Sequence, residues 1–345
     1  MPQTSHQNSV AESASIADEF RALVSNAAVY DLSTRARISL NGSDRVRWLN
    51  GMVTNNVRDL AAGHGVYAFL LNPQGHPQAD LYAYNHGESV LVDIDRTLLE
   101  KVLGIFDHYI IMDDVEVTDL SDKASVLGIA GPKARATLQA AGVEFPDLEP
   151  LQFAEVIRHN MPLTVTRNDN VAVETYEVQL EPPAKSEVSQ ALVNAGATPV
   201  GEAALELLRI ACGIPRYGQD IRERDLPQET EQARALHFSK GCYVGQEIVE
   251  RIRSRGSVHR KFTGFHVDGT LPELGNKIQL DGKDNGEITS VAALPTAQGE
   301  LKVALGYLRR EFATPDKQLT AGDARLAVAN LPFAEALRNC KEIYV

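Results

Sequence analysis

The chain has 345 residues, of which 43% are hydrophobic and 23% charged, and this composition is ordinary for a folded protein of two or three domains. Its net charge of -12 argues against general nucleic-acid binding, and no hydrophobic run approaches the roughly 18 residues that a membrane span needs. The three cysteines, Cys212, Cys242 and Cys340, lie far apart, which argues against a disulfide framework and against a zinc site built within the chain.

The first sixteen residues contain no Lys or Arg and no hydrophobic segment. They are therefore expected to form a flexible polar tail rather than a signal peptide. Together with the absence of paired cysteines, this predicts a reducing, cytoplasmic setting.

The next hundred or so residues mix strand and helix patterns, with apolar residues at every second position in the strands and every third or fourth in the helices. A helix is expected from about Ile16, and another through Trp48. Strands are expected at 28–32, 37–42, 65–71, 78–84 and 89–94, followed by a helix from Arg96 to about His108. This order predicts an α+β domain.

A second α+β unit is expected from about Val115. It has strands at 126–129, 161–166 and 172–180 and helices that begin at 131, 185 and 201. Residues 211–232 show no regular pattern, and a long loop of this kind is usually functional or disordered. After Arg260, short strands alternate with glycine turns, which predicts a small C-terminal β-barrel.

The stretch Lys240-Gly-Cys-Tyr-Val-Gly-Gln-Glu247 is the strongest candidate for chemistry. If it is extended, Lys240 and Cys242 share a face, and the ammonium lies beside the sulfur. A helix that begins near Gly245 would bring its N-terminal amides close as well. Both effects favour the thiolate, the reactive form of cysteine. The alternative is that Cys242 is a small buried core residue, which is the commonest role of a free cysteine.

Positive charge is concentrated around this stretch. Between His237 and Lys261 there are six Lys or Arg against two Glu, although the chain as a whole is acidic. This basic segment predicts either a site for a small anionic ligand or a solvated basic helix face, and the pattern alone leaves both open.

Residues 240–247 resemble the signature of the YgfZ proteins, folate-binding relatives of the glycine cleavage T-protein (GcvT, aminomethyltransferase) that assist iron–sulfur cluster assembly or repair. The segments 42–57, 71–81 and 208–220 are similar to elements of the wider superfamily. The resemblance implies an α+β, GcvT-like ring of three domains around a central folate cavity. Domain 1 would comprise residues 17–114 and 205–255, domain 2 residues 115–204, and the β-barrel residues 256–345.

The resemblance also implies which residues meet tetrahydrofolate. Asp80 would face its N5/N10 edge, while Ala79 stands where T-proteins have a second Asp. Glu177 would hold the pterin's aminopyrimidine edge, because a carboxylate accepts two N–H bonds side by side. Both could instead be ordinary solvent-facing strand residues. Arg209, Tyr243 and Gln246 are further candidates for folate contacts. The cations from Arg251 to Arg260, which include Arg255, could hold the glutamate tail.

Two functions follow. In the first, the protein binds tetrahydrofolate and uses Cys242 with Lys240 to maintain iron–sulfur clusters in client or scaffold proteins, since a thiolate can coordinate iron or attack sulfur. In the alternative, it is a folate-dependent aminomethyltransferase with Asp80 as the acid–base group. Neither function requires a membrane or nucleic-acid partner.

Overall fold

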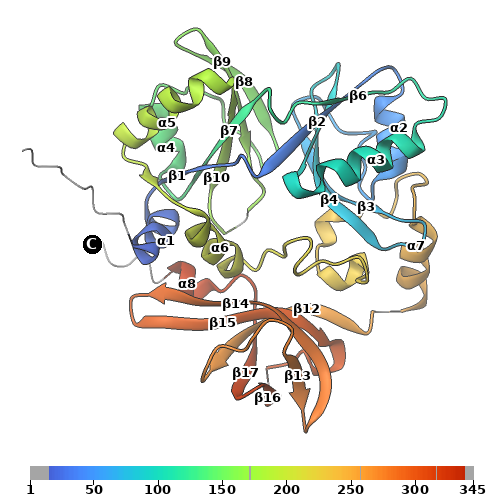
Figure 1. The fold of residues 1–345 in the computed structure, drawn as a ribbon, viewed down its shortest axis with the longest axis vertical. Helices are drawn as coiled ribbons and strands as arrows, with labels where there is room; N and C mark the ends of the chain where they lie inside the picture. The colour runs from blue at the N-terminus through green and yellow to red at the C-terminus, as the bar shows by residue number, and fades with distance from the viewer. Residues whose placement is uncertain (1–14, 171, 257, 316, 339–345) are drawn as a thin grey trace, which may run out of the picture.

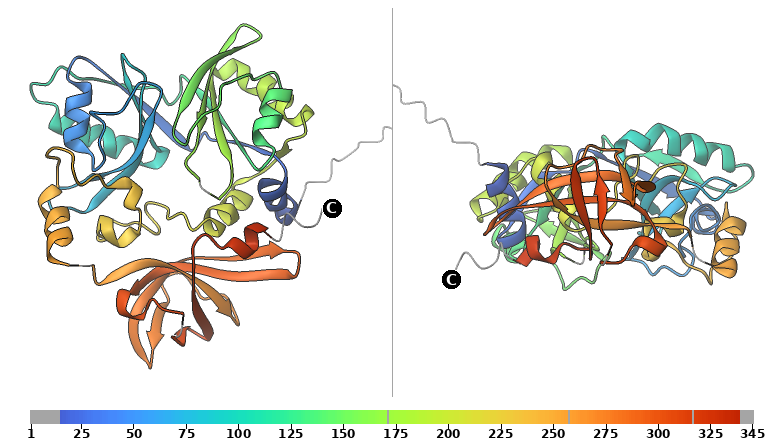
Figure 2. Two further views of the ribbon diagram at one scale, coloured as in Figure 1. Left: turned by 180° about the vertical axis from the view of Figure 1, so that it is seen from behind. Right: turned by 90° about the horizontal axis from the view of Figure 1, so that it is seen from below.

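The computed structural model describes residues 15–338 except 171, 257 and 316. Figure 1 shows two α+β domains side by side above a β-barrel, and the view from below in Figure 2 shows that the three lie in one flat layer. The predicted arrangement of two α+β domains and a C-terminal barrel is thereby confirmed.

Domain 1 is built on a sheet of strand order β3-β4-β5-β2-β6. Its core forms where alternate strand residues such as Ile38 and Leu81 pack against Trp48 of α2 and Phe106 of α3. The rings of Trp48 and Phe106 meet edge to face at 5.0 Å. The elements are β2 (Arg35–Asn41), α2 (Arg45–Met52), β3 (Gly65–Leu71), β4 (Pro77–Asn85), β5 (Val90–Asp95), η1 (Arg96–Leu98), α3 (Leu99–Tyr109) and β6 (Glu116–Asp119).

Domain 2 is a sheet of strand order β11-β1-β7-β10-β9-β8. Helices α4 and α5 bury Leu138 and Leu192 against the apolar side chains of one sheet face, among them Ile129 and Tyr176. The opposite face carries Glu177, which reaches toward domain 1. The elements are β1 (Ala28–Asp31), β7 (Ser125–Ala130), α4 (Ala134–Ala140), β8 (Phe153–Arg158), β9 (Met161–Arg167), β10 (Thr175–Leu180), η2 (Pro182–Ala184), α5 (Lys185–Asn194) and β11 (Thr198–Pro199).

Two strands belong to a different α+β domain from the one that the division drawn from the sequence gives them. β1 lies in the segment assigned to domain 1, yet it pairs with β7 and β11 of domain 2. β6 lies in the segment assigned to domain 2, yet it pairs with β2 of domain 1. The chain therefore crosses the domain boundary between β1 and β2 and again between β6 and β7.

Residues 202–255 connect all three domains. Leu208 of α6 (Glu202–Ala211) packs with Phe20 of α1 (Ile16–Ser25) and with barrel residues such as Tyr307. Farther along, the chain returns to domain 1, where Tyr243 and Val249 share a cluster with Tyr67. This part contains η3 (Pro227–Thr230), η4 (Ala233–Ala235) and α7 (Gln246–Arg255).

The C-terminal barrel is closed, with strand order β12-β15-β14-β13-β16-β17. Phe265, Ile278 and Leu305 are fully buried within or against it. Its elements are β12 (Arg260–Asp268), β13 (Lys277–Leu280), β14 (Lys283–Thr296), β15 (Gly299–Arg309), η5 (Arg310–Phe312), β16 (Leu319–Ala321), β17 (Ala324–Ala329) and α8 (Ala334–Arg338).

Candidate functional site

A cavity of about 380 Å³ lies where the three domains meet, and we call it the central cavity. Domain 1 contributes Tyr82 of β4, and domain 2 contributes the turn after β9. The segment 202–255 that connects the domains contributes residues 212–214 and 231–234, and the chain after β17 contributes Leu331 and Pro332. The lining residues are Tyr82, Asn168, Asp169, Asn170, Cys212, Gly213, Ile214, Glu231, Gln232, Ala233, Arg234, Leu331 and Pro332. A site with walls from every domain fits the ring-shaped fold.

Asp80 lies on β4, two residues before the lining residue Tyr82, and does not itself line the cavity. It accepts a 2.8 Å hydrogen bond from the hydroxyl of Tyr67, whose ring lies 5.0 Å from that of Tyr82. Burial raises the pKa of Asp80, while the Arg35 charge and the Tyr67 hydroxyl oppose that rise. The structure therefore does not leave Asp80 as a solvent-facing strand residue, and a carboxyl with a raised pKa is suited to proton transfer.

Glu177 lies on the facing strand β10 of domain 2. Its Oε2 accepts a 2.8 Å hydrogen bond from Arg37, whereas Oε1 has only a long 3.5 Å contact with Asn168, a cavity-lining residue. Burial and the neighbouring Asp93 raise the pKa of Glu177, while Arg37 and Arg35 lower it. One carboxylate oxygen thus retains the capacity to accept a ligand N–H.

Two arginines of β2, which the sequence analysis did not single out, hold these carboxylates in place. Arg35 donates from Nε to Asp93 at 2.6 Å, and Arg37 lies 2.9 Å from the same carboxylate. Burial alone would lower the pKa of Arg35, but Asp93, Glu177 and Asp80 together hold it above its ordinary value. Arg35 is therefore close enough to act on both candidate folate-binding carboxylates.

An ion pair between Arg234 and Asp169 joins the connecting segment to domain 2 at the cavity wall. The guanidinium of Arg234 also lies over the ring of Tyr67, 4.3 Å from its centroid, and Tyr82 donates to Asp169 at 3.2 Å. Neither residue stood out in the sequence, because each lies in an irregular segment with no local motif.

Lys240 does not take the place that the extended-strand argument gave it. Its ammonium is buried and donates to the carbonyl oxygens of Asn50, Val53 and Asn55, at 2.6, 2.6 and 2.5 Å. These bonds use every N–H of the ammonium, so none reaches Cys242. Burial, with a smaller effect from the Arg58 charge, lowers the pKa of Lys240 to about 7. Lys240 therefore fixes the turn that follows α2.

Cys242 is exposed, so it is not a core residue. The neighbouring Gly241 lies under Arg58: an added Cβ there would be 3.1 Å from the guanidinium. As predicted, the helix after the motif begins close to Gly245. That glycine has a positive φ of 82°, and an added Cβ would lie 2.6 Å from the carbonyl of Asn72. The thiol therefore sits on a surface turn of fixed shape beside an exposed cation.

Arg209 forms an internal junction instead of reaching into the central cavity. It makes five hydrogen bonds: two to Glu206, one to the carbonyl of Ile214, one to Asp220 and one to Ser290. All of its guanidinium N–H groups are thereby engaged within the protein. Arg209 does not line the central cavity, and its contact with a ligand stays a prediction.

The other motif candidates lie on or around α7. Tyr243 is buried with the Lys240 ammonium 5.1 Å from its ring centroid, and Gln246 is the first residue of α7. Arg251 is exposed on α7, and the side chain of Arg255 lies outside the described part of the chain. Tyr243, Gln246 and Arg251 do not line the central cavity. The solvated-helix interpretation of this segment fits the structure better than a tail-binding role does.

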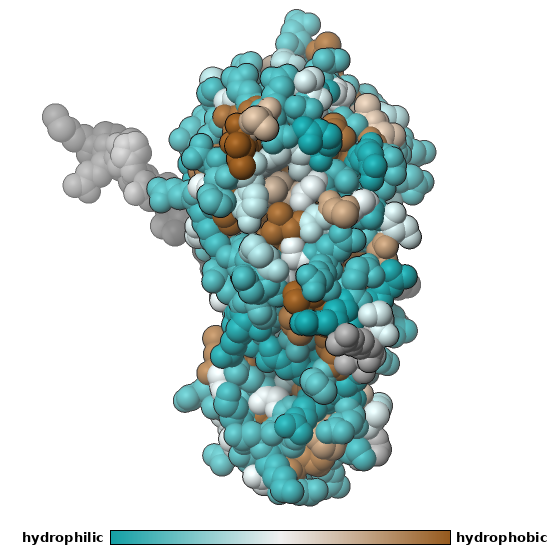
Figure 3. Space-filling view, turned by 90° about the vertical axis from the view of Figure 1, so that its right-hand side faces the viewer, coloured by the Kyte–Doolittle hydropathy of each residue, from teal (hydrophilic) through white to brown (hydrophobic). Residues whose placement is uncertain are grey.

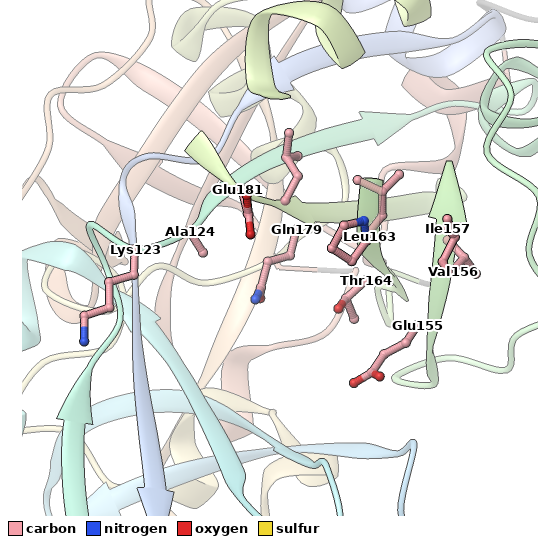
Figure 4. Close-up of a pocket in the computed structure, with 11 residues that line it drawn as sticks. Lys123, Ala124, Glu155, Val156, Ile157, Leu163, Thr164, Gln179 and Glu181 are labelled. Carbon is pink, nitrogen blue, oxygen red and sulfur yellow. The ribbon is translucent and has the colours of Figure 1, made fainter. Parts of the chain in front are cut away.

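Two surface features complete the survey. Figure 4 shows an open cavity of about 590 Å³ on domain 2, between Lys123, Glu155 and Glu181, which holds none of the predicted site residues. The face seen in Figure 3 is mainly hydrophilic, with small separate hydrophobic patches. Among the described residues, no group of three or more His, Cys, Asp or Glu is arranged to hold a metal ion.

No helix in the described part of the chain is long and apolar enough to cross a membrane.

Comparison with known proteins agrees with the fold. The family model of the GCVT N-terminal domain matches residues 2–240. An aminomethyltransferase of Rubrobacter xylanophilus is 30% identical over 287 residues, covering 82% of this chain and 77% of that protein. A putative chloroplastic transferase of Arabidopsis thaliana is 26% identical over 310 residues, with 88% and 71% covered. The crystal structure of the glycine cleavage system aminomethyltransferase T of Bartonella henselae superposes with a TM-score of 0.84 at 21% identity, covering 93% of this chain and 90% of that one. The chain belongs to the GCVT N-terminal domain family and has the aminomethyltransferase fold.

Proposed function

We propose that this protein binds a reduced folate in the central cavity and transfers a one-carbon group, of the aminomethyl class, to or from it. The observation that carries this proposal is a pair of half-buried carboxyl groups whose pKa values are raised, Asp80 from domain 1 and Glu177 from domain 2, beside a cavity of about 380 Å³. The relatives named aminomethyltransferases support the same class of reaction.

The residues present fit a folate. Glu177 Oε1 has only the long contact from Asn168, so it can accept N–H groups from an aminopyrimidine edge. Tyr82 offers a ring surface at the cavity wall, and the cavity volume falls within the usual range of about 300–1,000 Å³ for small-molecule sites. Asp80 would hold or release a proton at a folate nitrogen while the one-carbon group is transferred.

The test separates binding from chemistry. Calorimetric titration with tetrahydrofolate should give a saturable isotherm for the wild-type protein. Glu177→Gln should weaken binding about tenfold or more, because a buried hydrogen bond to a charged group is lost. Asp80→Asn should keep most of the affinity and lose transfer, measured as formation of methylenetetrahydrofolate. Absence of folate binding by the wild-type protein would refute the proposal.

A second function is favoured by one specific feature, the exposed thiol of Cys242 on a turn fixed by the buried Lys240. We propose that this thiol serves iron–sulfur proteins, as an accessory in assembly or repair of their clusters. Cys242→Ser should then abolish rescue of iron–sulfur enzyme activity in cells that lack the protein, with folate binding unchanged. Full rescue by Cys242→Ser would refute the iron–sulfur role of the thiol, and the transferase function would then be the one proposal that remains.

A further inference from the structure

The domain 2 sheet has an open edge at β8, the last strand in the order β11-β1-β7-β10-β9-β8. β8 pairs with β9, and the two strands are joined by His159 and Asn160, both of which have a positive φ. Figure 1 shows this hairpin at the upper end of the molecule. Neither of the functions proposed above uses the outer side of β8.

Alternate residues of β8 direct their backbone groups away from β9. In an antiparallel pair of strands, hydrogen-bonded and non-hydrogen-bonded residue pairs alternate. Ile157 lies opposite Pro162, which has no N–H, so this pair is of the non-bonded kind. The pairs of Glu155 and Phe153 with β9 are then of the same kind, because they follow at intervals of two residues. The N–H and C=O groups of Phe153, Glu155 and Ile157 therefore point to the open edge.

Domain 1 covers only the beginning of this edge. Phe153 donates to the carbonyl of Gly63 at 2.9 Å, and Gly65 donates to the carbonyl of Leu151 at 2.7 Å. Glu155 and Ile157 make no such backbone bond to any residue in the described part of the chain. Two residues of β8 thus present unpaired backbone groups at the surface, which is where a further strand can add to a sheet.

The side chains at this edge are also exposed. Ile157 is 76% exposed, the side chain of Glu155 is 75% exposed, and both line the open cavity shown in Figure 4. The nearest charge partner of Glu155 is His86, at a long 3.5 Å. Natural proteins usually protect an edge strand with charges or prolines, so an exposed isoleucine there favours a strand that covers it.

The open stretch fits a second copy of itself. If two β8 strands lie antiparallel with Val156 facing Val156 across a twofold axis, Glu155 of each copy lies opposite Ile157 of the other. Both of these are hydrogen-bonded pairs, and they use the open N–H and C=O groups of both residues in both copies. No like charges then lie opposite each other.

Other registers fit less well. A shift of two residues toward the start of β8 places Glu155 opposite Glu155 and Ile157 opposite Phe153, whose N–H is already bonded to Gly63. The opposite shift places Glu155 against His159, which has a positive φ and belongs to the hairpin turn. The geometry of the edge therefore selects the register centred on Val156.

We propose that this protein forms a symmetric dimer in which the β8 strands of two copies pair antiparallel about Val156. Pairing would join the two domain 2 sheets into one continuous sheet and cover Ile157. An isologous contact of this kind, with the same surface on both copies, is the commonest way in which identical chains associate.

Sedimentation velocity of the full-length protein over a wide range of concentration tests this. We expect a monomer at low concentration and a dimer at high concentration. Ile157→Pro removes an N–H that points to the edge and that β9 does not use, so the monomer should fold. The dimer should weaken by more than about tenfold, because each copy loses a hydrogen bond to the other. Far-UV circular dichroism and the unfolding temperature verify folding.

A second pair of variants tests the register. Ile157→Glu places a carboxylate opposite Glu155 of the other copy, twice by symmetry, and should weaken the dimer about tenfold. Ile157→Lys places opposite charges there and should leave the dimer at least as stable as that of the wild type. Leu274→Glu makes the same change at another exposed apolar residue, 58% exposed near the barrel, and is the matched control.

A mass that stays monomeric at every concentration would overturn the proposal and leave the edge to an extended segment of a different protein. A dimer that persists unchanged in both Ile157→Pro and Ile157→Glu would place the contact elsewhere and overturn it as well. Equal weakening by Ile157→Glu and Ile157→Lys would rule out the register centred on Val156.

Discussion

Arg37 of β2 donates to Glu177 of β10 at 2.8 Å, across the boundary between domains 1 and 2. The same guanidinium lies 2.9 Å from Asp93, so one cation pairs with the buried Asp93 and the half-buried Glu177. This arrangement both joins the domains and leaves one oxygen of Glu177 available to the central cavity.

Replacing Arg37 by Leu should destabilise the protein by about 3–5 kcal/mol, because two buried carboxylates lose a charge partner. The pKa of Glu177, which Arg37 lowers, would then rise further in the folded state. The folded state would bind protons more readily, so the loss of stability should be larger at pH 8 than at pH 5. Urea unfolding at both pH values measures this. Arg96→Gln removes a half-exposed arginine paired with Asp122 and should change stability by less than about 1 kcal/mol. An equally small effect of Arg37→Leu would contradict the role of the pair.

Lys240→Met should cost about 3 kcal/mol, since three buried carbonyls lose their donor. In the folded protein Lys240 loses its proton near pH 7, because its pKa is lowered to about 7. In the unfolded chain it keeps the proton up to about pH 10.4. The unfolded state binds more protons over this range. Wild-type stability should therefore rise with pH relative to Lys240→Met. Parallel urea curves at pH 7 and pH 9 would test this, and a constant difference between the two proteins would count against it.

Tyr67→Phe should shift the acidic limb of the transfer activity to higher pH. The Tyr67 hydroxyl donates to Asp80 and lowers the pKa of that carboxyl, so its removal lets the pKa rise further. A pH–rate profile of kcat/KM reports this midpoint. Tyr84→Phe removes the hydroxyl of another buried tyrosine, on the neighbouring strand β4, and is the matched control. If the midpoint does not move, Asp80 is not the group whose ionisation controls the transfer.

The two described thiols should react at very different rates. Cys242 is exposed, whereas Cys212 lines the central cavity, accepts a 3.5 Å contact from Asn170, and has its pKa raised by burial to about 11. Iodoacetamide at pH 8 should label Cys242 at least tenfold faster. Peptide mass spectrometry resolves each site, with Cys340 followed separately. Bound folate should protect Cys212 alone. Protection of Cys242 instead would place the ligand at the α7 turn.

The sequence predicted much of the fold, since alternating patterns such as Ala79, Leu81 and Ala83 bury one face of a strand. It could not predict which domain β1 and β6 belong to, because strand partners far apart in the chain leave no local signal. Strand β8 was missed although its residues Phe153 to Arg158 include β-forming types, because nearby polar residues masked the pattern.

At the site, resemblance identified Asp80 and Glu177, and both lie beside the central cavity. The position given to Lys240 beside the sulfur was wrong because residues 238–245 form turns and irregular backbone instead of a strand, and the ammonium points to the carbonyls of residues 50–55. Arg35 and Arg37 carried no usable signal, because with Ser39 and Asn41 they form the polar face of an alternating strand, and that pattern is typical of a face in solvent.

The position of β1 in the chain has a mechanical consequence. The domain 1 strands β2 to β6 form one continuous stretch, whereas the domain 2 sheet pairs β7 with β1, which comes before that stretch. A chain cut in the crossover between β6 and β7 would therefore leave the domain 1 sheet with all its strands and deprive the domain 2 sheet of β1, so domain 2 depends on the continuity of the chain through domain 1.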